Sequence, residues 1–164
     1  MGDQQERSDL AFAAGLITGE GTFTIGLLRT GKNARATPIF SITMKDRATM
    51  LYLYDILLDN GLSAHFSQKK KELFHIKATG LKRVQKYCEI FLPYLVGGKK
   101  KSAELVLEFI ESRLSKPPNS GFTAYEIDLV DQLRKHHGSR HPNILPISEI
   151  LRDYTPGTYT RNKS

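Results

Sequence analysis

The sequence predicts an α+β fold in which helices and two β-hairpins alternate in the order αββαββα, followed by C-terminal helices. Two observations support this fold class. Stretches with alternating polar and apolar residues occur in two pairs, and segments with helical spacing of apolar residues precede, separate and follow these pairs. We expect one domain over residues 1–164, with a core over about 8–135 and a basic tail over about 136–164.

The first predicted helix covers Ser8 to Thr18, where apolar and small residues recur at helical spacing. Ser8 or Asp9 can cap its N-terminus, and Gly21 can end it in the left-handed conformation. Glu20 is unexpected here, because a helix C-terminus already carries partial negative charge and disfavours a carboxylate. A residue that breaks a local rule in this way is a candidate functional residue.

The first hairpin is predicted by two stretches in which apolar and polar side chains alternate. Residues 22–30 form one strand and residues 38–44 the other, with a turn-rich loop over 31–38 between them. In both strands the apolar residues share one face, and Ser and Thr residues share the other. Helices can cover the apolar face, which leaves the polar face free.

A capped helix and a second hairpin come next. Asp46 can cap a helix that runs to about Asn60, with Gly61 closing it. Residues 64–78 alternate as the first hairpin does and therefore predict two more strands, with Lys69–Lys71 at their turn. Together the two hairpins are expected to form one antiparallel sheet shaped as a saddle.

The remaining chain predicts three helices and a tail. The helices cover, in order, about residues 81–92, 102–114 and 123–135. The tail is rich in Gly, Pro and basic residues, with one short helix expected over 147–154. His136, His137 and His141 lack the spacing of a zinc site, so we assign them to the tail.

Positive charge gathers on the polar side of the predicted sheet. The chain has a net charge of +7, which favours a polyanionic partner. A two-stranded ribbon fits the major groove of DNA, so we expect the polar face to bind double-stranded DNA. The residues expected to contact it are Thr22, Thr24, Arg29, Lys32, Arg35, Ser41, Thr43, His65, Ser67, Lys69, Lys70, His75 and Lys77. The alternative is an ordinary half-buried sheet whose polar face is only solvated.

The composition excludes several classes of protein. A single cysteine, Cys88, rules out an internal disulfide framework. No apolar run approaches the roughly 20 residues that cross a bilayer. The first nine residues are polar and do not resemble a signal peptide. We therefore expect an intracellular protein that makes no membrane contact.

Small residues on the first helix predict a second copy of the chain as partner. Ala11, Gly15 and Gly19 are spaced by four, and small residues at this spacing let two helix backbones approach closely. The residues expected at this homodimer interface are Ala11, Ala14, Gly15, Thr18 and Gly19. The alternative is that they pack against the chain's own core. Two copies would bring two Glu20 carboxylates together, and a divalent cation would remove their repulsion.

The stretch AAGLITGEG resembles the signature of the LAGLIDADG homing endonucleases, and the predicted αββαββα order is that of the family's half-domain. The match holds at residues 14–17 and 19–21, and the downstream stretch FLPYLVGGKKKSAELVLEFIE extends it. The resemblance covers about residues 8–135. The chain contains one copy of the signature, which is similar to the homodimeric members of the family.

The resemblance implies a metal-dependent, site-specific DNA endonuclease encoded in an intron or a similar mobile element. It implies that Glu20 and the Gly19 carbonyl bind Mg²⁺, for which Mn²⁺ or Ca²⁺ can substitute, and that hydrolysis of both strands leaves 3′ overhangs. Glu20 is accordingly the first expected catalytic residue.

Two further catalytic residues are implied by the same resemblance. Lys99 aligns with a family lysine near the water network, with Lys100 and Lys101 as alternatives, and a phosphate-binding or solvated loop is the other reading of this run. Arg47 is the candidate for a polar position at the start of the second helix, with Lys45 close by.

The signature departs from the family pattern at two positions. Thr18 stands where the first acid usually lies, and Glu20 replaces the commoner Asp. These departures keep a second function open, namely a DNA-binding protein or RNA maturase with the same fold and weak or no cleavage. A third alternative, an unrelated α+β protein with basic hairpins, requires the signature to be a coincidence.

Overall fold

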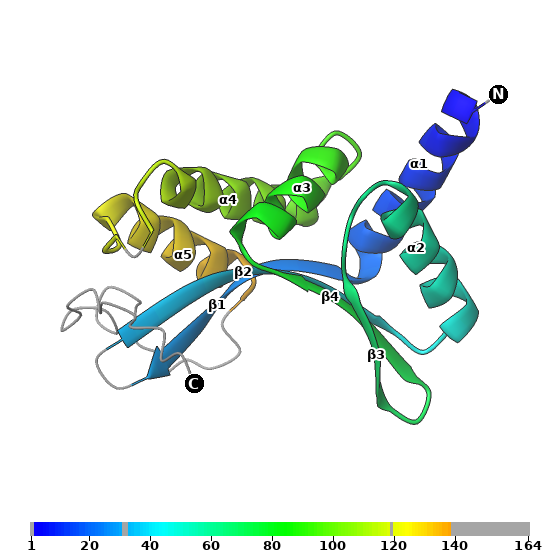
Figure 1. Cartoon of the computed structure of the whole chain (residues 1–164), viewed down its shortest axis with the longest axis horizontal. Coiled ribbons are helices and arrows are strands. Elements are labelled where there is room, and N and C mark those ends of the chain that lie inside the picture. The colour runs from blue at the N-terminus through cyan, green and yellow to red at the C-terminus, as the bar shows by residue number, and fades with distance from the viewer. Residues whose placement is uncertain (1, 31–32, 119, 139–164) are drawn as a thin grey trace.

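The computed structural model describes residues 2–30, 33–118 and 120–138. Four strands form one antiparallel sheet in the order β1-β2-β4-β3. Helices cover one side of it, and no helix of the described residues lies on the other side (Figure 1). The elements are α1 (Gly2–Glu20), β1 (Gly21–Thr30), β2 (Asn33–Met44), α2 (Arg47–Asp59), β3 (His65–Lys70), β4 (Leu73–Thr79), α3 (Leu81–Phe91), α4 (Gly97–Leu114) and α5 (Ala124–His136). The predicted α+β class is confirmed. The short helix expected over 147–154 lies outside the described residues.

Helix α1 is longer than the predicted 8–18 segment, because it begins at Gly2 and ends at Glu20. Residues 2–8 are exposed, and Gln5 Nε2 donates to Asp9 Oδ1 at 2.9 Å one turn later. Such a turn has no apolar face, so hydrophobic spacing does not reveal it. Figure 1 shows this end of α1 projecting away from the rest of the chain.

Gly21 is the first residue of β1 and not a left-handed helix end, which corrects its predicted role. A Cβ atom at this position would lie 2.7 Å from the carbonyl oxygen of Ile17. Gly21 is therefore required for the close approach of strand to helix rather than for a positive φ. As a result α1 passes into β1 with no connecting loop.

Strand β2 begins at Asn33, so most of the loop expected over 31–38 is strand. Pro38 is tolerated there because β2 pairs with β4 only from Ile39 onward. The Pro38 carbonyl accepts from Gly80 N at 3.0 Å. The nitrogen of Pro38 lies on that same edge of β2, beyond the last residue pair with β4, so no hydrogen bond of the sheet is lost.

The register of the sheet separates polar from apolar side chains. One row of paired residues crosses all four strands and is entirely polar: Thr22, Ser41, Lys77 and His65. We call the side of the sheet that carries this row the polar face. The neighbouring row points to the other side and contains Phe23, Phe40 and Ala78, which are all buried. Phe40 stacks on Tyr87 of α3 with ring centroids 4.5 Å apart, so the helices cover the apolar face.

Helix α2 matches its prediction, because the Asp46 side chain accepts from Ala48 N at 3.0 Å and Gly61 has a φ of 70°. Helix α4 differs, since it begins at Gly97 and not at Ser102. A Cβ atom on Gly98 would lie 3.3 Å from His136 Nε2, so a glycine at this position allows α5 to approach the start of α4. The run Lys99–Lys101 therefore lies in a helix and not in a loop.

Helix α5 is fixed to α4 by a buried carboxylate. Glu126 has a fully buried side chain, and it accepts hydrogen bonds from Lys116, from Ser112 Oγ at 2.8 Å and from Arg113 Nη1 at 3.1 Å. It also closes the capping box with Thr123 at the start of α5. Burial alone would raise the pKa of Glu126, but these hydrogen bonds outweigh it and hold the pKa below the ordinary 4.5.

We expect Glu126→Gln to lower the free energy of unfolding by about 1.5–3 kcal/mol at neutral pH, because charge-assisted hydrogen bonds are lost. The wild-type carboxylate contributes stability above pH 4.5, and this contribution is lost as the pH falls through its lowered folded pKa. Urea unfolding from about pH 7 to about pH 3 measures the difference. Glu89→Gln, at an exposed position on α3, is the matched control. A Glu126→Gln deficit that stays constant over this range would contradict the ion-pair account.

Candidate nucleic-acid interface and active centre

The polar face offers a continuous set of hydrogen-bonding side chains. Beside the row that begins at Thr22 lies a second polar row, in which His75 pairs with Thr43 on one side and with Ser67 on the other. Strand β1 adds Thr24 to the same face. Ten residues of β1 span roughly 33 Å, close to the length of one turn of B-DNA.

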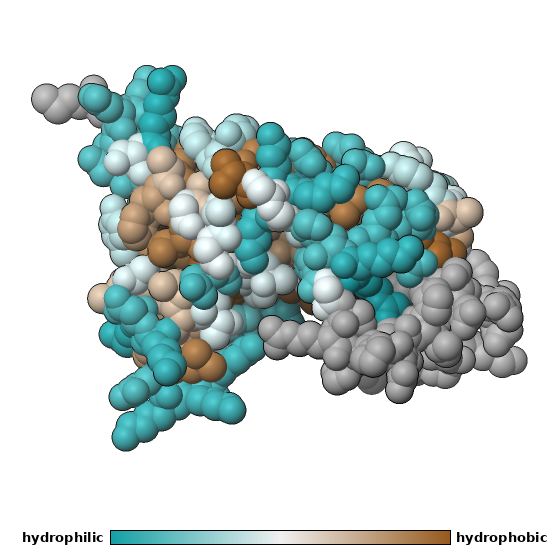
Figure 2. Space-filling model, turned by 180° about the vertical axis from the view of Figure 1, so that it is seen from behind, coloured by the Kyte–Doolittle hydropathy of each residue, from teal (hydrophilic) through white to brown (hydrophobic). Residues whose placement is uncertain are grey.

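Cations stand at the outer ends of the hairpins. Lys69 and Lys70 are exposed at the tip of β3 and β4, the hydrophilic projection of Figure 2. Arg35 is exposed near the start of β2. Lys32 and the side chain of Arg29 lie outside the described residues. The described cations are therefore placed where a long polyanion on the polar face would pass.

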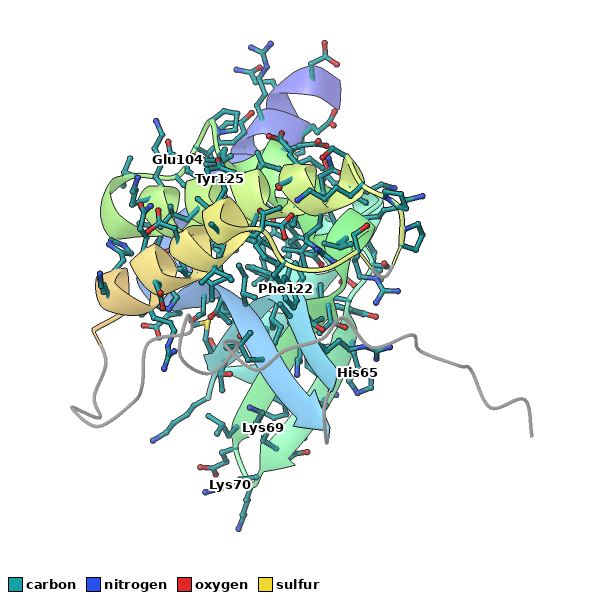
Figure 3. All side chains as sticks on the ribbon, turned by 90° about the vertical axis from the view of Figure 1, so that its left-hand side faces the viewer. His65, Lys69, Lys70, Glu104, Phe122 and Tyr125 are labelled. Carbon is teal, nitrogen blue, oxygen red and sulfur yellow. The ribbon has the colours of Figure 1, made fainter. Side chains whose placement is uncertain are left out.

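Two acidic side chains of α4 lie on the opposite side of the molecule from the tip of β3 and β4. Figure 3 shows Glu104 and Tyr125 on the helical layer, at the far end from Lys69 and Lys70. The Tyr125 hydroxyl donates to Glu108 Oε2 at 2.9 Å, which places a second carboxylate on that layer. These two carboxylates therefore do not repel a polyanion that approaches the tip cations.

His75 differs from the exposed polar residue that the strand pattern predicts, because it is buried with an exposed fraction of 8%. Burial lowers its pKa below 6.5, and the positive charges of Lys69 and Lys77 and the nearby His65 lower it further. At neutral pH the ring is therefore uncharged. A neutral imidazole has one donor and one acceptor, which suits a hydrogen bond to a base better than an ion pair with a phosphate.

Two of the expected catalytic residues, Glu20 and Lys99, lie at the junction of α1 and β1. Glu20 is exposed, and within the described part of the chain it makes no hydrogen bond or ion pair. Lys99 lies in the first turn of α4, and its ammonium group donates to the carbonyl of Gly21, the residue after Glu20. Of the three lysines in the run, Lys99 is therefore the one with a contact next to the acid.

Arg47 is the first residue of α2. It follows the end of β2, where Ile42 pairs with Gly21 of the α1–β1 junction. No ion pair joins Arg47 to Glu20 among the described side chains. Its catalytic role therefore still depends on the resemblance alone, as does that of Lys45.

The described residues of one chain offer only part of a metal site. No group of three His, Cys, Asp or Glu side chains that could hold an ion occurs in the described ranges. The end of α1 provides one carboxylate, Glu20, and main-chain carbonyls that have no helical partner, including that of Gly19. These are oxygen donors of the kind that Mg²⁺ prefers, and they fit the ion once a second carboxylate and a phosphate complete the set.

One face of α1 is left exposed by the described residues. Ala11, Gly15 and Gly19 are exposed, and a Cβ atom on either glycine would meet nothing within 4 Å. The chain's own core therefore does not explain these three small residues. Ala14 requires a correction, because it is buried in the chain's own core with 2% exposure. Thr18 is partly buried and borders a cavity.

The cavity has a volume of about 670 Å³ and lies between α1, β1, α4 and the end of α5. The polar side chains that line it are Thr18, Thr22, Lys99, Ser102, His136 and His137. His136 is the last residue of α5 and His137 its C-cap, which corrects their assignment to the tail. Their position as basic residues in the last turn of a predicted helix was the available signal.

Comparison with known proteins finds similar structures but no relative by sequence. No protein-family model and no curated protein matches the chain. The homing endonuclease I-CvuI in complex with the I-CreI target superimposes with a TM-score of 0.70 at 18% identity, covering 90% of this chain and 95% of that chain. The archaeal intron-encoded homing endonuclease I-Vdi141I complexed with DNA gives 0.67 at 15% identity, covering 93% and 96%.

The chain also matches about half of a longer protein. The I-SmaMI LAGLIDADG homing endonuclease bound to cleaved DNA gives a TM-score of 0.65 at 16% identity, and the match covers 94% of this chain but 51% of that chain. The chain thus has the LAGLIDADG homing-endonuclease fold, as its signature predicts. Among the described residues no helix is long and apolar enough to cross a bilayer.

We expect the ring of His75 to protonate only below pH 6.5, because it is buried among positive groups. A pH titration of its ring signals by NMR measures this value. Lys69→Gln should raise the pKa of His75, whereas the control Lys82→Gln, at an exposed position on α3, should not. A wild-type His75 ring that protonates at or above pH 6.5 would show that the buried, cationic surroundings have no effect.

Proposed function

We propose that this chain, with its LAGLIDADG homing-endonuclease fold, is one subunit of a homodimeric, site-specific endonuclease that hydrolyses both strands of double-stranded DNA. One observation carries the proposal: an exposed carboxylate, Glu20, stands at a loop-free junction between the polar face and a helix face of exposed small residues. DNA binding, dimer formation and chemistry thereby converge at one place.

The exposed small residues of α1 and the length of the chain support a homodimer. Gly15 and Gly19 have open space in front of them, which a second α1 can fill at close backbone distance. The chain matches I-CvuI over nearly its whole length but only half of I-SmaMI, so it has the size of one half of the longer protein. Two copies related by a two-fold axis would double the polar face and pair the two acids.

The chemistry follows from the groups at this junction. Glu20 and the Gly19 carbonyl of each subunit would hold Mg²⁺, with Mn²⁺ or Ca²⁺ as substitutes. The bound ion supplies charge neutralisation and a more acidic water. Lys99, held beside the acid by its bond to the Gly21 carbonyl, would stabilise negative charge that develops on the phosphate. Arg47 is proposed as a further contact to the water network, from the start of α2.

The polar face determines which DNA is cut. Its hydroxyl, imidazole and lysine side chains bind base edges and phosphates, and the tip cations Lys69 and Lys70 add contacts that do not depend on sequence. Each subunit contributes one Glu20, so each would serve one strand. In keeping with the fold, we propose that the product has 3′ overhangs and that an intron or a similar mobile element encodes the protein.

A second candidate function is DNA or RNA binding without efficient cleavage, as in a maturase. It is favoured by Thr18 at the place of the usual first acid, and by the longer Glu20 in place of Asp. A displaced carboxylate of this kind can cost roughly 100-fold in rate. Against it, an exposed carboxylate at a helix C-terminus serves no purpose in a protein that only binds.

Glu20→Gln tests the proposed function directly. With Mg²⁺ and a target selected from a randomised duplex library, the wild type should cut both strands. The variant should bind with similar affinity but cut at least about 100-fold more slowly, because it loses the charged ligand. Gel shift and single-turnover cleavage measure the two properties. Equal cleavage by both proteins would remove Glu20 from the active centre, and binding without cleavage by the wild type would establish the second candidate.

Gly15→Leu tests the pairing of α1. The added side chain should hold two helix backbones apart, so the dimer should dissociate in analytical ultracentrifugation while the far-UV circular dichroism stays unchanged. Gly2→Leu is the matched control, because Gly2 lies on the same helix and also has nothing within 4 Å. A Gly15→Leu protein that remained a tight and active dimer would exclude this face as the interface.

A further inference from the structure

Several residues that line the cavity beside the α1–β1 junction have no role in the reaction proposed above. Of its polar residues, Lys99, His136 and His137 can carry positive charge, and none of the described residues that line it is acidic. Thr18 and Thr22, from α1 and β1, add hydroxyl groups. Cationic and donor groups from four elements thus line one cavity, and no carboxylate of the described residues lines it with them.

The two histidines are held in place by the first turns of α4. His136 Nε2 lies 2.8 Å from the Gly98 carbonyl oxygen, to which it can only donate. The Ser102 hydroxyl donates to the same oxygen at 3.1 Å, so its own oxygen is left to accept from His137 Nε2 at 3.0 Å. With both Nε2 atoms engaged, Nδ1 of each ring is the atom left to bind a further group.

The electrostatics of the hollow favour an anion. Burial lowers the pKa of His137, and the positive charges of His136 and Lys99 lower it further. The side chain of Val96, the N-cap of α4, makes no capping hydrogen bond, so main-chain N–H groups at this helix start add partial positive charge. An anion that entered would relieve this concentration of charge and favour the protonated rings.

We propose that this cavity binds a phosphate of the DNA backbone, with His136 and His137 as its ligands. The proposal rests on the DNA-binding function proposed above. Thr22 belongs both to the cavity lining and to the polar row of the sheet, so the hollow is continuous with the face on which DNA lies. Glu20 is not among the lining residues, so the bound phosphate is a neighbour of the one that is cut.

The test combines protein variants with DNA in which single phosphates are neutralised as methylphosphonates. On the selected target, the wild type should lose roughly ten-fold in affinity at one phosphate position per half-site, as expected for charge-assisted hydrogen bonds. The double variant His136→Gln, His137→Gln keeps amide donors for α4, and the same neutralisation should cost it almost nothing. His137→Lys in that background should restore the sensitivity. Lys86→Gln, at an exposed position on α3, is the control and should behave as the wild type.

A merely structural role for the histidines gives a different result. In that case the affinity loss caused by the double histidine variant and the loss caused by neutralising a phosphate would simply add, whichever phosphate is neutralised. If the wild type still bound and cut its target, this result would exclude the phosphate site but not the proposed endonuclease. A wild type that binds no duplex would remove the proposed function itself. In that case inorganic phosphate provides a separate probe. A rise in the pKa of His137 upon its addition, with the His65 ring signals unmoved in the same NMR spectra, would identify a site for free phosphate and overturn DNA as its source.

Discussion

The close packing of Gly21 against the carbonyl of Ile17 joins α1 to β1 without a loop, and the rest of the arrangement depends on this junction. Because helix and strand are continuous, Glu20 has a fixed place relative to the polar row that starts one residue after Gly21. The exposed face of α1 is fixed relative to the sheet for the same reason. A partner bound to that face therefore also sets where a second polar face would lie.

The strand pattern carried most of the information about the fold. Alternation with a period of two predicted four strands and assigned each residue to a polar or an apolar face, because only one face is buried. Local capping chemistry predicted the start of α2 at Asp46. The start of β2 was not predictable in this way. From the sequence alone, Pro38 is typical of a loop. In the structure β4 pairs with β2 only from Ile39 onward, so the N–H that Pro38 lacks would have had no partner on β4.

The candidate site was predictable only where its residues are close in the sequence. The signature around Glu20 supplied the acid and the small residues, but it did not distinguish Ala14, which faces the core, from Gly15, which faces outward. The contact of Lys99 with Gly21 joins residues 78 positions apart, and that of His136 with Gly98 joins residues 38 apart. Such contacts arise from the packing of α4 and α5, for which no local pattern provides a signal.

The central claim is that two α1 helices pack side by side at a two-fold axis, and a distance measurement tests it most directly. Burial raises the pKa of the Cys88 thiol to about 12, so a spin label will react selectively with a cysteine introduced by Glu6→Cys, at an exposed position of α1. In the DNA complex, double electron–electron resonance should give one narrow distance, consistent with two α1 helices whose axes lie about 8–10 Å apart. The absence of any dipolar coupling between labels, with DNA bound, would contradict the account.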